Sequence, residues 1–154
     1  MSVKPCRYST VMLSEGSQSA AVIFGGVRMR KQVVHTDKVP PARVPLSQAI
    51  RAGDWIFASG QLGNDPRTRT LAEGGIGPET RQVCENLKAV LEAAGSSLDK
   101  VVKVTIYMVD LGELAQMNEI FSRYFAVDPP ARTTFQCARL VADARVEIEA
   151  IAMA

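Results

Sequence analysis

Residues 78–95, PETRQVCENLKAVLEAAG, and residues 101–109, VVKVTIYMV, decide the fold class. The first stretch predicts a helix, because its apolar residues recur at helical spacing, Pro78 suits a first turn and Gly95 suits the position after a last turn. The second stretch is dense in β-branched residues and predicts a buried strand. A helix that leads directly into a buried strand indicates a layered domain that contains both helices and a sheet.

Further strands are predicted on both sides of this pair. Two of them, at residues 46–50 and 55–59, flank a turn at residues 51–54. Two more follow near the end of the chain, at residues 133–137 and 145–153. The last of them alternates apolar and polar residues from Val146 to Glu149, as expected for a strand that has one face on a core.

A second helix is predicted after residue 110, where Asp110 and Glu113 resemble a capping box. Its apolar stripe consists of Leu114, Phe121, Tyr124 and Phe125. The complete order, β-β-α-β-α-β-β, predicts an α+β fold in which a single mixed sheet is covered by two helices on one face. Because two helices leave the other face of the sheet uncovered, the pattern also favours self-association.

The composition is that of a folded globular domain and narrows the range of functions. Of the 154 residues, 47% are hydrophobic and 22% are charged, and the formal net charge is +2. No run of five Lys or Arg residues occurs, which argues against nucleic acid as a partner. The longest apolar stretch, residues 20–27, is far shorter than the roughly 20 residues of a membrane-spanning helix, so no membrane segment is expected.

The chain has three cysteines and one histidine. The cysteines are widely spaced and form no C-x-x-C pair, which argues against a disulfide framework or a zinc site and favours a reducing compartment. His35 alone cannot build a histidine-rich metal site, and it lies in a polar segment that is poorly suited to a catalytic triad. Chemistry in this chain must therefore rely on carboxylates, arginines, hydroxyls and backbone groups.

Residues 1–40 are expected to form an N-terminal extension, and residues 41–154 the folded domain. Residues 1–31 contain five basic residues, one acidic residue and several serines, a composition compatible with an organellar transit peptide. The alternatives are a flexible extension or a true start at Met29. The expected location is the cytoplasm, or the mitochondrion if residues 1–31 are a transit peptide.

Two segments next to predicted strands are candidates for binding a ligand. Ser59 and Gly60 follow a strand, and a glycine lets a ligand approach the backbone amides closely. The alternative is an ordinary turn. Arg132 stands at the start of another strand, where its planar guanidinium suits a carboxylate. The alternative there is a surface arginine or an ion pair.

Two glutamates, Glu147 and Glu149, share one face of the last predicted strand. A carboxylate on a partly buried face is either paired with a cation, here Arg132 or Arg139, or held with a raised pKa for acid–base work. Asn118 lies on the apolar face of the second helix and needs a buried partner. A structural bond to a neighbouring loop is favoured over contact with a substrate.

Six short motifs occur in order along the chain: ASGQ at 58–61, NLKAVLEAAG at 86–95, VVKVT at 101–105, MNE at 117–119, PAR at 130–132 and VEIEA at 146–150. Together they resemble the RidA/YjgF family. The resemblance runs in register from Pro45 to Met153 and leaves residues 1–40 unmatched.

The resemblance implies a chorismate-mutase-like fold and a homotrimer whose sheets form a central barrel. The active sites would lie in clefts between subunits, with no metal or organic cofactor. The implied activity is that of a 2-iminobutanoate/2-iminopropanoate deaminase, which hydrolyses reactive imines and enamines, such as those from 2-aminoacrylate, to 2-keto acids and ammonia. Such intermediates escape from pyridoxal-phosphate enzymes and damage them.

Roles for individual residues follow from their places in these motifs. Arg132 would hold the substrate carboxylate, and Glu147 would orient or activate the attacking water. Ser59 and Gly60 would contact the keto or imino end of the substrate. Thr134 stands where the family often has a cysteine whose backbone contributes to the cleft. Asn118 matches a family asparagine and is expected to be architectural.

Leu46 departs from the family, which often has a tyrosine at this position lining the cleft. The loss of that hydroxyl predicts an altered rate or a preference for a more apolar substrate. Three alternatives remain open: a pathway-specific deaminase of the 2-aminomuconate type, an endoribonuclease or translation inhibitor, and a non-catalytic trimer that binds a small ligand. The lack of a histidine pair and of a basic tract argues against the second, and the presence of both Arg132 and Glu147 argues against the third.

Overall fold

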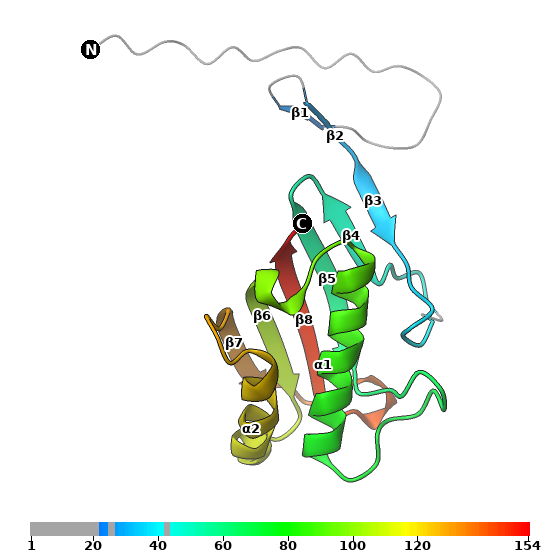
Figure 1. The fold of residues 1–154 in the computed structure, drawn as a ribbon. Helices are drawn as coiled ribbons and strands as arrows, with labels where there is room; N and C mark the ends of the chain where they lie inside the picture. Colours follow the sequence, from blue (N-terminus) through cyan, green and yellow to red (C-terminus); the bar gives the residue numbers. More distant parts are fainter. Residues whose placement is uncertain (1–21, 25–26, 42–43) are drawn as a thin grey trace, which may run out of the picture.

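The computed structural model describes residues 22–24, 27–41 and 44–154 (Figure 1). Helices α1 (Ile76–Ala93) and α2 (Leu114–Tyr124) lie on one face of a six-stranded sheet of order β3-β4-β5-β8-β6-β7. The strands are β3 (Lys31–Val34), β4 (Ala49–Ala52), β5 (Trp55–Leu62), β6 (Val101–Met108), β7 (Ala131–Gln136) and β8 (Val146–Met153). The predicted α+β architecture, with two helices on one face, is confirmed.

The sheet is mixed, as predicted. Strands β6 and β7 pair in parallel, and the other neighbouring strands pair antiparallel. The parallel pair requires a crossover connection, which α2 and the short 3₁₀ helix η2 (Leu111–Glu113) supply. Helix α1 packs on β5 and β8 and also contacts α2.

The glycines that the sequence placed at a turn and after a helix occupy those positions because of their backbone conformation. Gly53, with φ of 62°, makes the tight turn between β4 and β5, and Gly95, with φ of 82°, follows the end of α1. Both values lie in the left-handed region that only glycine adopts without strain. The strands start or end a few residues away from the predicted limits, and their existence and order are as expected.

The predicted capping box at the start of the second helix is wrong. The carboxylate of Asp110 accepts a bond from the amide of Gly112 at 2.7 Å, so it caps η2 and not α2. Glu113 makes no capping bond and instead pairs with Arg145, with 2.7 Å between Oε1 and Nη1. The spacing of Asp110 and Glu113 is that of a capping box, but Glu113 forms an ion pair with the distant Arg145 instead.

Three strands lie in the segment that the sequence assigned to the N-terminal extension. Strands β1 (Val22–Phe24) and β2 (Val27–Met29) form a separate two-stranded sheet. Strand β3 pairs with β4 and forms an edge of the main sheet, so the sheet begins ahead of residue 41. Residues 1–21, on which the transit-peptide prediction mostly rests, are outside the described residues.

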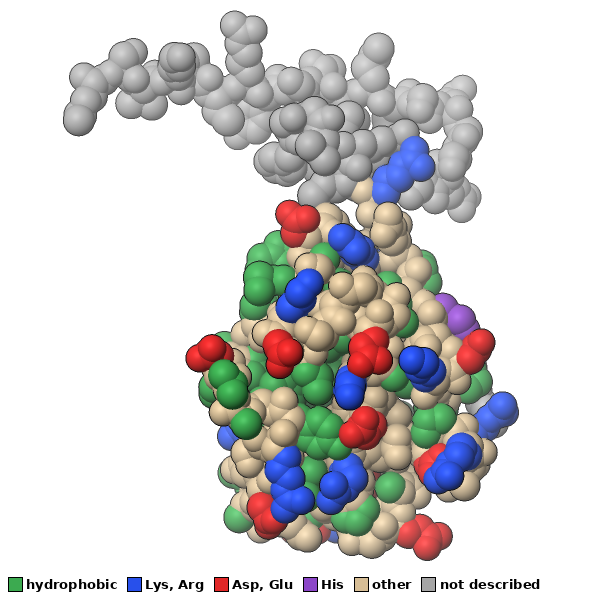
Figure 2. Space-filling model, viewed as in Figure 1, with side chains coloured by type: hydrophobic (Ala, Val, Ile, Leu, Met, Phe, Trp, Pro, Cys, Tyr) green, Lys and Arg blue, Asp and Glu red, His purple; other side chains and the backbone are tan. Residues whose placement is uncertain are grey.

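The two faces of the sheet differ sharply. Towards the helices, the strands present fully buried side chains such as Val104, Ile106 and Ile148. By register, the opposite face carries large apolar side chains that are 41–64% exposed: Val33, Trp55, Phe57, Phe135 and Met153. The helix-covered side has acidic and basic side chains interspersed over its surface (Figure 2). No helix in the described ranges is long and apolar enough to cross a membrane.

Candidate active site

A β-bulge interrupts the pairing of β5 with β8 at the centre of the sheet. Ala58 pairs with Ala150 and Gln61 with Ile148, so Ser59 and Gly60 together oppose a single residue. A bulge of this kind bends the strand and redirects its side chains, and bulges are frequent beside active sites. The Ser-Gly motif found in the sequence is therefore a feature of a strand and not the start of a loop.

The carboxylate of Glu147 lies directly against Gly60. A Cβ added to residue 60 would lie 2.7 Å from Cδ of Glu147 and closer still to Oε1, a separation that real atoms do not adopt. A side chain at residue 60 would therefore displace the Glu147 carboxylate, and this is the reason for glycine here, since its φ is not in the left-handed region. The side chain of Glu147 is half-buried, and this burial, followed by the charge of Glu149, raises the pKa of Glu147 above its usual range.

No cation neutralises this carboxylate within the described chain. Neither Glu147 nor Glu149 forms an ion pair there, because Arg139 pairs with Asp143 at 2.8 Å and Arg132 bonds elsewhere. The predicted alternative, in which Arg132 or Arg139 pairs with the glutamates, is therefore wrong for the single chain. A half-buried carboxyl with a raised pKa and no counter-ion is suited to proton transfer near neutral pH.

Ser59 is fixed in place by the segment that precedes β4. Its hydroxyl donates to the carbonyl of Ser47 at 2.7 Å, and its amide donates to the carbonyl of Gln48 at 3.0 Å. With its proton engaged, the hydroxyl oxygen can only accept a further hydrogen bond. Leu46 belongs to the same segment, and 51% of its surface is exposed.

Arg132, near the start of β7, is held by α2. Its Nη1 donates to Oδ1 of Asn118 at 2.7 Å, and its guanidinium carbon lies 5.4 Å from the centre of the Phe121 ring. The partner that Asn118 required is therefore Arg132 and not a loop. Arg132 is exposed and, among the described residues, forms no ion pair, so its other N–H groups can bind a carboxylate in a bidentate manner.

Thr134 lies two residues further along β7, on the same face as Arg132. Its Oγ1 is buried and has no hydrogen-bond partner in the described part of the chain. An unpartnered buried hydroxyl costs about 1–3 kcal/mol, so it is more stable once a partner arrives. The hydroxyl is thus a buried polar group on the same side of the edge strand as the guanidinium, two residues away.

The candidate residues fall into two groups on opposite faces of the sheet. Arg132 pairs with Val104 across β6 and β7 and points to the helix side, where Asn118 also lies. Glu147 pairs with Tyr107 of β6 and points to the face without helices. Strand β6 separates the two strands that carry the candidate arginine and glutamate. One chain alone does not bring these two side chains together.

Tyr107 is a candidate site residue that the sequence did not point to. It lies on the same face as Glu147, with its ring against Phe135 at 5.0 Å between centres. Its pKa is raised, first by burial, then by hydrogen bonding to Glu149 and by the charges of the two glutamates. The available signal was the alternation of strand β6, which places residue 107 on the same face as residues 103 and 105.

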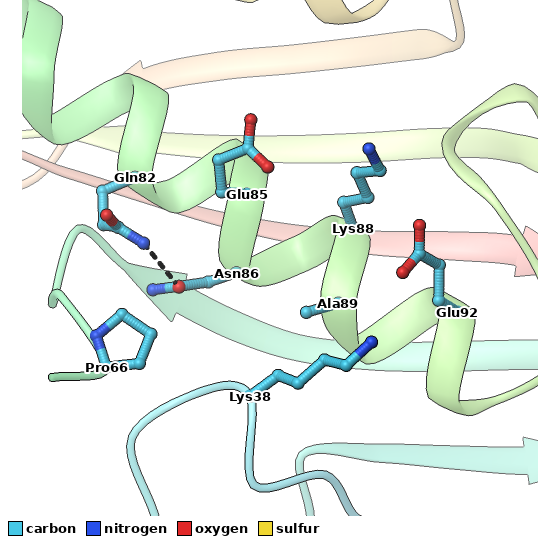
Figure 3. Close-up of a pocket in the computed structure, with 8 residues that line it drawn as sticks. All are labelled: Lys38, Pro66, Gln82, Glu85, Asn86, Lys88, Ala89 and Glu92. Carbon is cyan, nitrogen blue, oxygen red and sulfur yellow. Dashed lines mark hydrogen bonds between the residues drawn. The ribbon is translucent and has the colours of Figure 1, made fainter.

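A separate cavity of about 300 Å³ lies beside α1 (Figure 3). It is lined by Lys38, Pro66, Gln82, Glu85, Asn86, Lys88, Ala89 and Glu92, none of which is among the predicted site residues. Gln82 donates to Asn86, one turn further along α1, at 2.9 Å. In the described part of the chain, no three His, Cys, Asp or Glu side chains converge as a metal site would require.

Comparison with known proteins fits the motifs and the fold. A family model described as Endoribonuclease L-PSP, which represents the RidA/YjgF family, matches residues 36–154. The chain belongs to the RidA/YjgF family. The solved structure of a putative endoribonuclease from Thermotoga maritima matches this chain with a TM-score of 0.78 and 46% identity. The match covers 80% of this chain and 97% of that chain.

Several relatives in the RidA/YjgF family align over most of their length. A RutC family protein of Pyrococcus horikoshii is 48% identical over 79% of this chain and 97% of its own. The mouse protein named 2-iminobutanoate/2-iminopropanoate deaminase is 42% identical, and the alignment covers 80% of this chain and 91% of the mouse protein. Reactive Intermediate Deaminase A, chloroplastic, of Arabidopsis thaliana is 39% identical, and the alignment covers 92% of this chain and 75% of the Arabidopsis protein. Some RidA/YjgF relatives are therefore named as imine deaminases, and others only by family.

Proposed function

We propose that this protein hydrolyses imines and enamines derived from 2-amino acids, such as 2-iminobutanoate and 2-iminopropanoate, to 2-keto acids and ammonia. The observation that carries the proposal is the carboxyl of Glu147, which lies against Gly60 without a counter-ion and with a raised pKa. Water attack on an imine needs a base of this kind and no metal. The deaminase names of relatives such as the mouse protein support the same reaction.

Arg132 is the proposed anchor of the substrate carboxylate. Asn118 and the Phe121 ring orient the guanidinium, which leaves its remaining N–H groups free to bind two carboxylate oxygens. Thr134 lies beside it with an unpartnered hydroxyl. A small 2-imino or 2-keto acid carries the negative group that this arrangement fits.

The complete site needs a second copy of the chain. Arg132 and Glu147 point to opposite faces of the sheet, so a substrate that touches both must lie between two subunits. The exposed apolar residues of the helix-free face, among them Trp55 and Phe57, favour the burial of that face in an assembly. We propose a homotrimer with its sheets around a central barrel and three active sites between subunits.

The proposed reaction begins with the protonated imine. Glu147 removes a proton from water as the water oxygen bonds to C2, which gives a carbinolamine. Glu147 then returns that proton to the nitrogen and takes the proton of the carbinolamine hydroxyl as the C–N bond breaks. The oxygen becomes the carbonyl of the keto acid, and the ammonia that leaves takes up this second proton from Glu147 as ammonium. Since the hydroxyl of Ser59 already donates to Ser47, its oxygen would accept a bond from the imine N–H.

An amino-acid oxidase that generates 2-iminobutanoate in the cuvette tests the proposal. Keto-acid release that is faster with the protein than without it supports imine hydrolysis. No acceleration by a well-folded protein would contradict it. Parallel assays of 2-aminomuconate deamination and of RNA cleavage test the pathway-specific and endoribonuclease alternatives. Binding of a 2-keto acid without turnover would indicate a ligand-binding trimer.

Gly60→Ala is expected to lower kcat by about 10- to 100-fold, because the new Cβ displaces the carboxylate of Glu147 and misplacement of about 1 Å can cost that much. KM is expected to change little, since Arg132 is untouched. Gly77→Ala is the matched control, because its nearest new contact is an ordinary 3.4 Å. Equal kinetics for the two variants would refute the role of this contact.

Leu46→Tyr is expected to shift substrate preference. Leucine at an exposed position beside the Ser59 segment offers no hydroxyl, so the native protein should favour the longer 2-iminobutanoate over 2-iminopropanoate. The tyrosine variant should reduce that ratio of kcat/KM values by about 4-fold, because burying one methylene contributes about 0.8 kcal/mol. A native protein that already prefers the shorter imine would contradict this interpretation.

The proposed location is the cytoplasm, with the mitochondrion as the alternative if residues 1–31 are removed as a transit peptide. The basic, serine-containing composition of that segment supports the alternative. N-terminal sequencing of the mature protein from its natural host distinguishes the two locations. A native N-terminus at Met1 would argue against import with cleavage.

A further inference from the structure

Glu79 is a buried acidic residue for which the proposed reaction has no use. It lies in the first turn of α1 with only 3% of its surface exposed. Its Oε1 accepts a hydrogen bond from the amide of Arg145 at 2.7 Å, and it also interacts with the amide of Val146. These are the residue before β8 and the first residue of β8, and Glu147 follows directly.

The other side of Glu79 contacts the end of β5. A Cβ on Gly63 would lie 2.8 Å from the carbonyl oxygen of Glu79 and 3.0 Å from its Cα, so only glycine allows this approach. Gly63 directly follows Leu62, the last residue of β5, and Leu62 pairs with Glu147. Glu79 therefore touches the ends of the two strands that hold Gly60 and Glu147.

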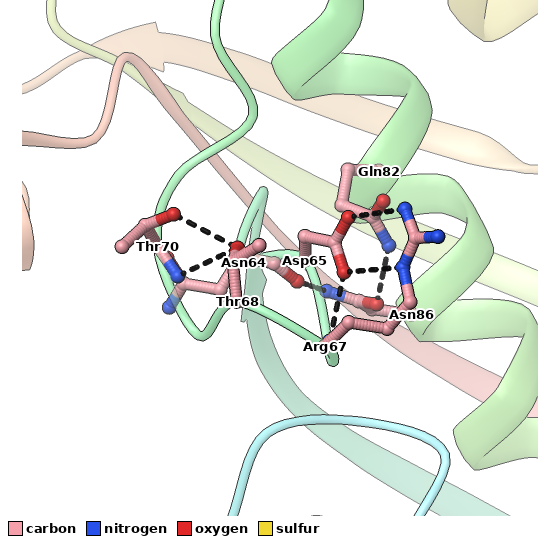
Figure 4. A network of polar contacts seen from close by, with 7 residues as sticks. All are labelled: Asn64, Asp65, Arg67, Thr68, Thr70, Gln82 and Asn86. Atoms are coloured by element: carbon pink, nitrogen blue, oxygen red, sulfur yellow. Dashed lines mark hydrogen bonds and ion pairs between the residues drawn. The ribbon is translucent and has the colours of Figure 1, made fainter.

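A second polar residue of α1 holds the same strand end. The side-chain Nδ2 of Asn86 donates to the backbone carbonyls of Leu62 and Asn64, both at 2.9 Å, on either side of Gly63. Gln82 in turn donates to Asn86, and this network joins α1 to the turn after β5 (Figure 4). Helix α1 thus fixes β5 through Asn86 and joins β5 to β8 through Glu79.

We infer that Glu79 is a positioning residue, which keeps the Glu147 carboxylate against Gly60 by fixing the start of β8 relative to the end of β5. The inference rests on the proposed function for its kinetic consequence, although the positioning itself does not. Glu79 acts through backbone contacts and does not touch the substrate. Its charged neighbours are Arg145 and Glu113, and those of Glu147 are Glu149 and Tyr107.

The experiment compares Glu79→Met with Glu79→Gln in the full chain. Both substitutions are neutral and similar in size, and only glutamine keeps an oxygen that can accept the Arg145 amide. Glu79→Met is expected to lower kcat by about 10- to 100-fold with little change in KM, and Glu79→Gln by less than about 3-fold. The acid limb of the pH profile should move to lower pH in Glu79→Met only, because a displaced Glu147 is better solvated.

Carbon-13 NMR of the glutamate carboxyls, with Glu147→Gln for assignment, measures the titration of Glu147 without any substrate. A lower Glu147 midpoint in Glu79→Met than in Glu79→Gln supports positioning, even if the wild type hydrolyses no imine and the proposed function fails. Equal midpoints in the two variants overturn the inference. If Glu79→Met does not fold, Gly63→Ala displaces Glu79 from the other side, and an unchanged Glu147 midpoint there overturns it equally.

Discussion

Arg132→Ala is expected to lower kcat/KM for 2-iminobutanoate by about 100- to 1,000-fold, since each hydrogen bond to a charged group contributes about 1.5–3 kcal/mol. Arg132 is exposed at the sheet edge and is oriented by Asn118 at 2.7 Å. Its loss removes the proposed anchor of the substrate carboxylate and leaves the proposed base, Glu147, intact. Initial rates over a range of imine concentrations measure the effect.

Arg132→Lys is the matched control for this prediction. Lysine keeps the positive charge and loses the planar fork that can bind two carboxylate oxygens. An intermediate loss is therefore expected. Because Arg132 is exposed and its partner Asn118 is only half-buried, water can replace the lost bond, and both variants should lose little thermal stability. Full activity in the alanine variant would remove Arg132 from the site.

Glu147→Gln is expected to lower kcat by about 100- to 10,000-fold, the range found when a general base is removed. Glutamine is nearly isosteric, so the contact with Gly60 remains and only proton transfer is lost. Because burial and Glu149 raise the pKa of Glu147, wild-type activity should rise with pH through a midpoint above the usual glutamate range. That limb should be absent from the residual activity of the variant.

The same substitution is expected to stabilise the protein at neutral pH. The folded state binds the Glu147 proton more tightly than the unfolded chain does, since the folded pKa is raised. The stabilising contribution is therefore present below the unfolded pKa and is lost as pH rises through the folded pKa. Denaturant titrations of the wild type and Glu147→Gln at low and neutral pH measure the difference in their free energies of unfolding. A variant that is less stable than the wild type at neutral pH would contradict the raised pKa.

The sequence predicted the elements that depend on local physics. The helix that ends before Gly95 and the buried strand at 101–108 follow from periodicity and glycine conformation alone. Strand β3 could not be predicted in this way, because only its pairing with β4 makes Lys31–Val34 a strand. The role of Glu113 also depends on a distant partner, Arg145.

The candidate site was predictable in its residues and not in its geometry. Ser59, Gly60 and Glu147 were identified from motifs, yet the bulge that brings them together appears only in the register of β5 with β8. The motifs also gave no sign that Arg132 and Glu147 face opposite sides of one sheet. Glu79 gave no signal at all, since a glutamate in the first turn of a helix is ordinary.

The most direct test of the central claim, that the active site is built from two copies of the chain, is the imine-hydrolysis rate of a mixed assembly. Arg132→Ala and Glu147→Gln are unfolded together in equal amounts, refolded and assayed beside each variant alone. If each site takes its arginine and glutamate from different subunits, random mixing should restore about one quarter of the wild-type rate. A mixture no more active than the two separate variants would contradict a shared site.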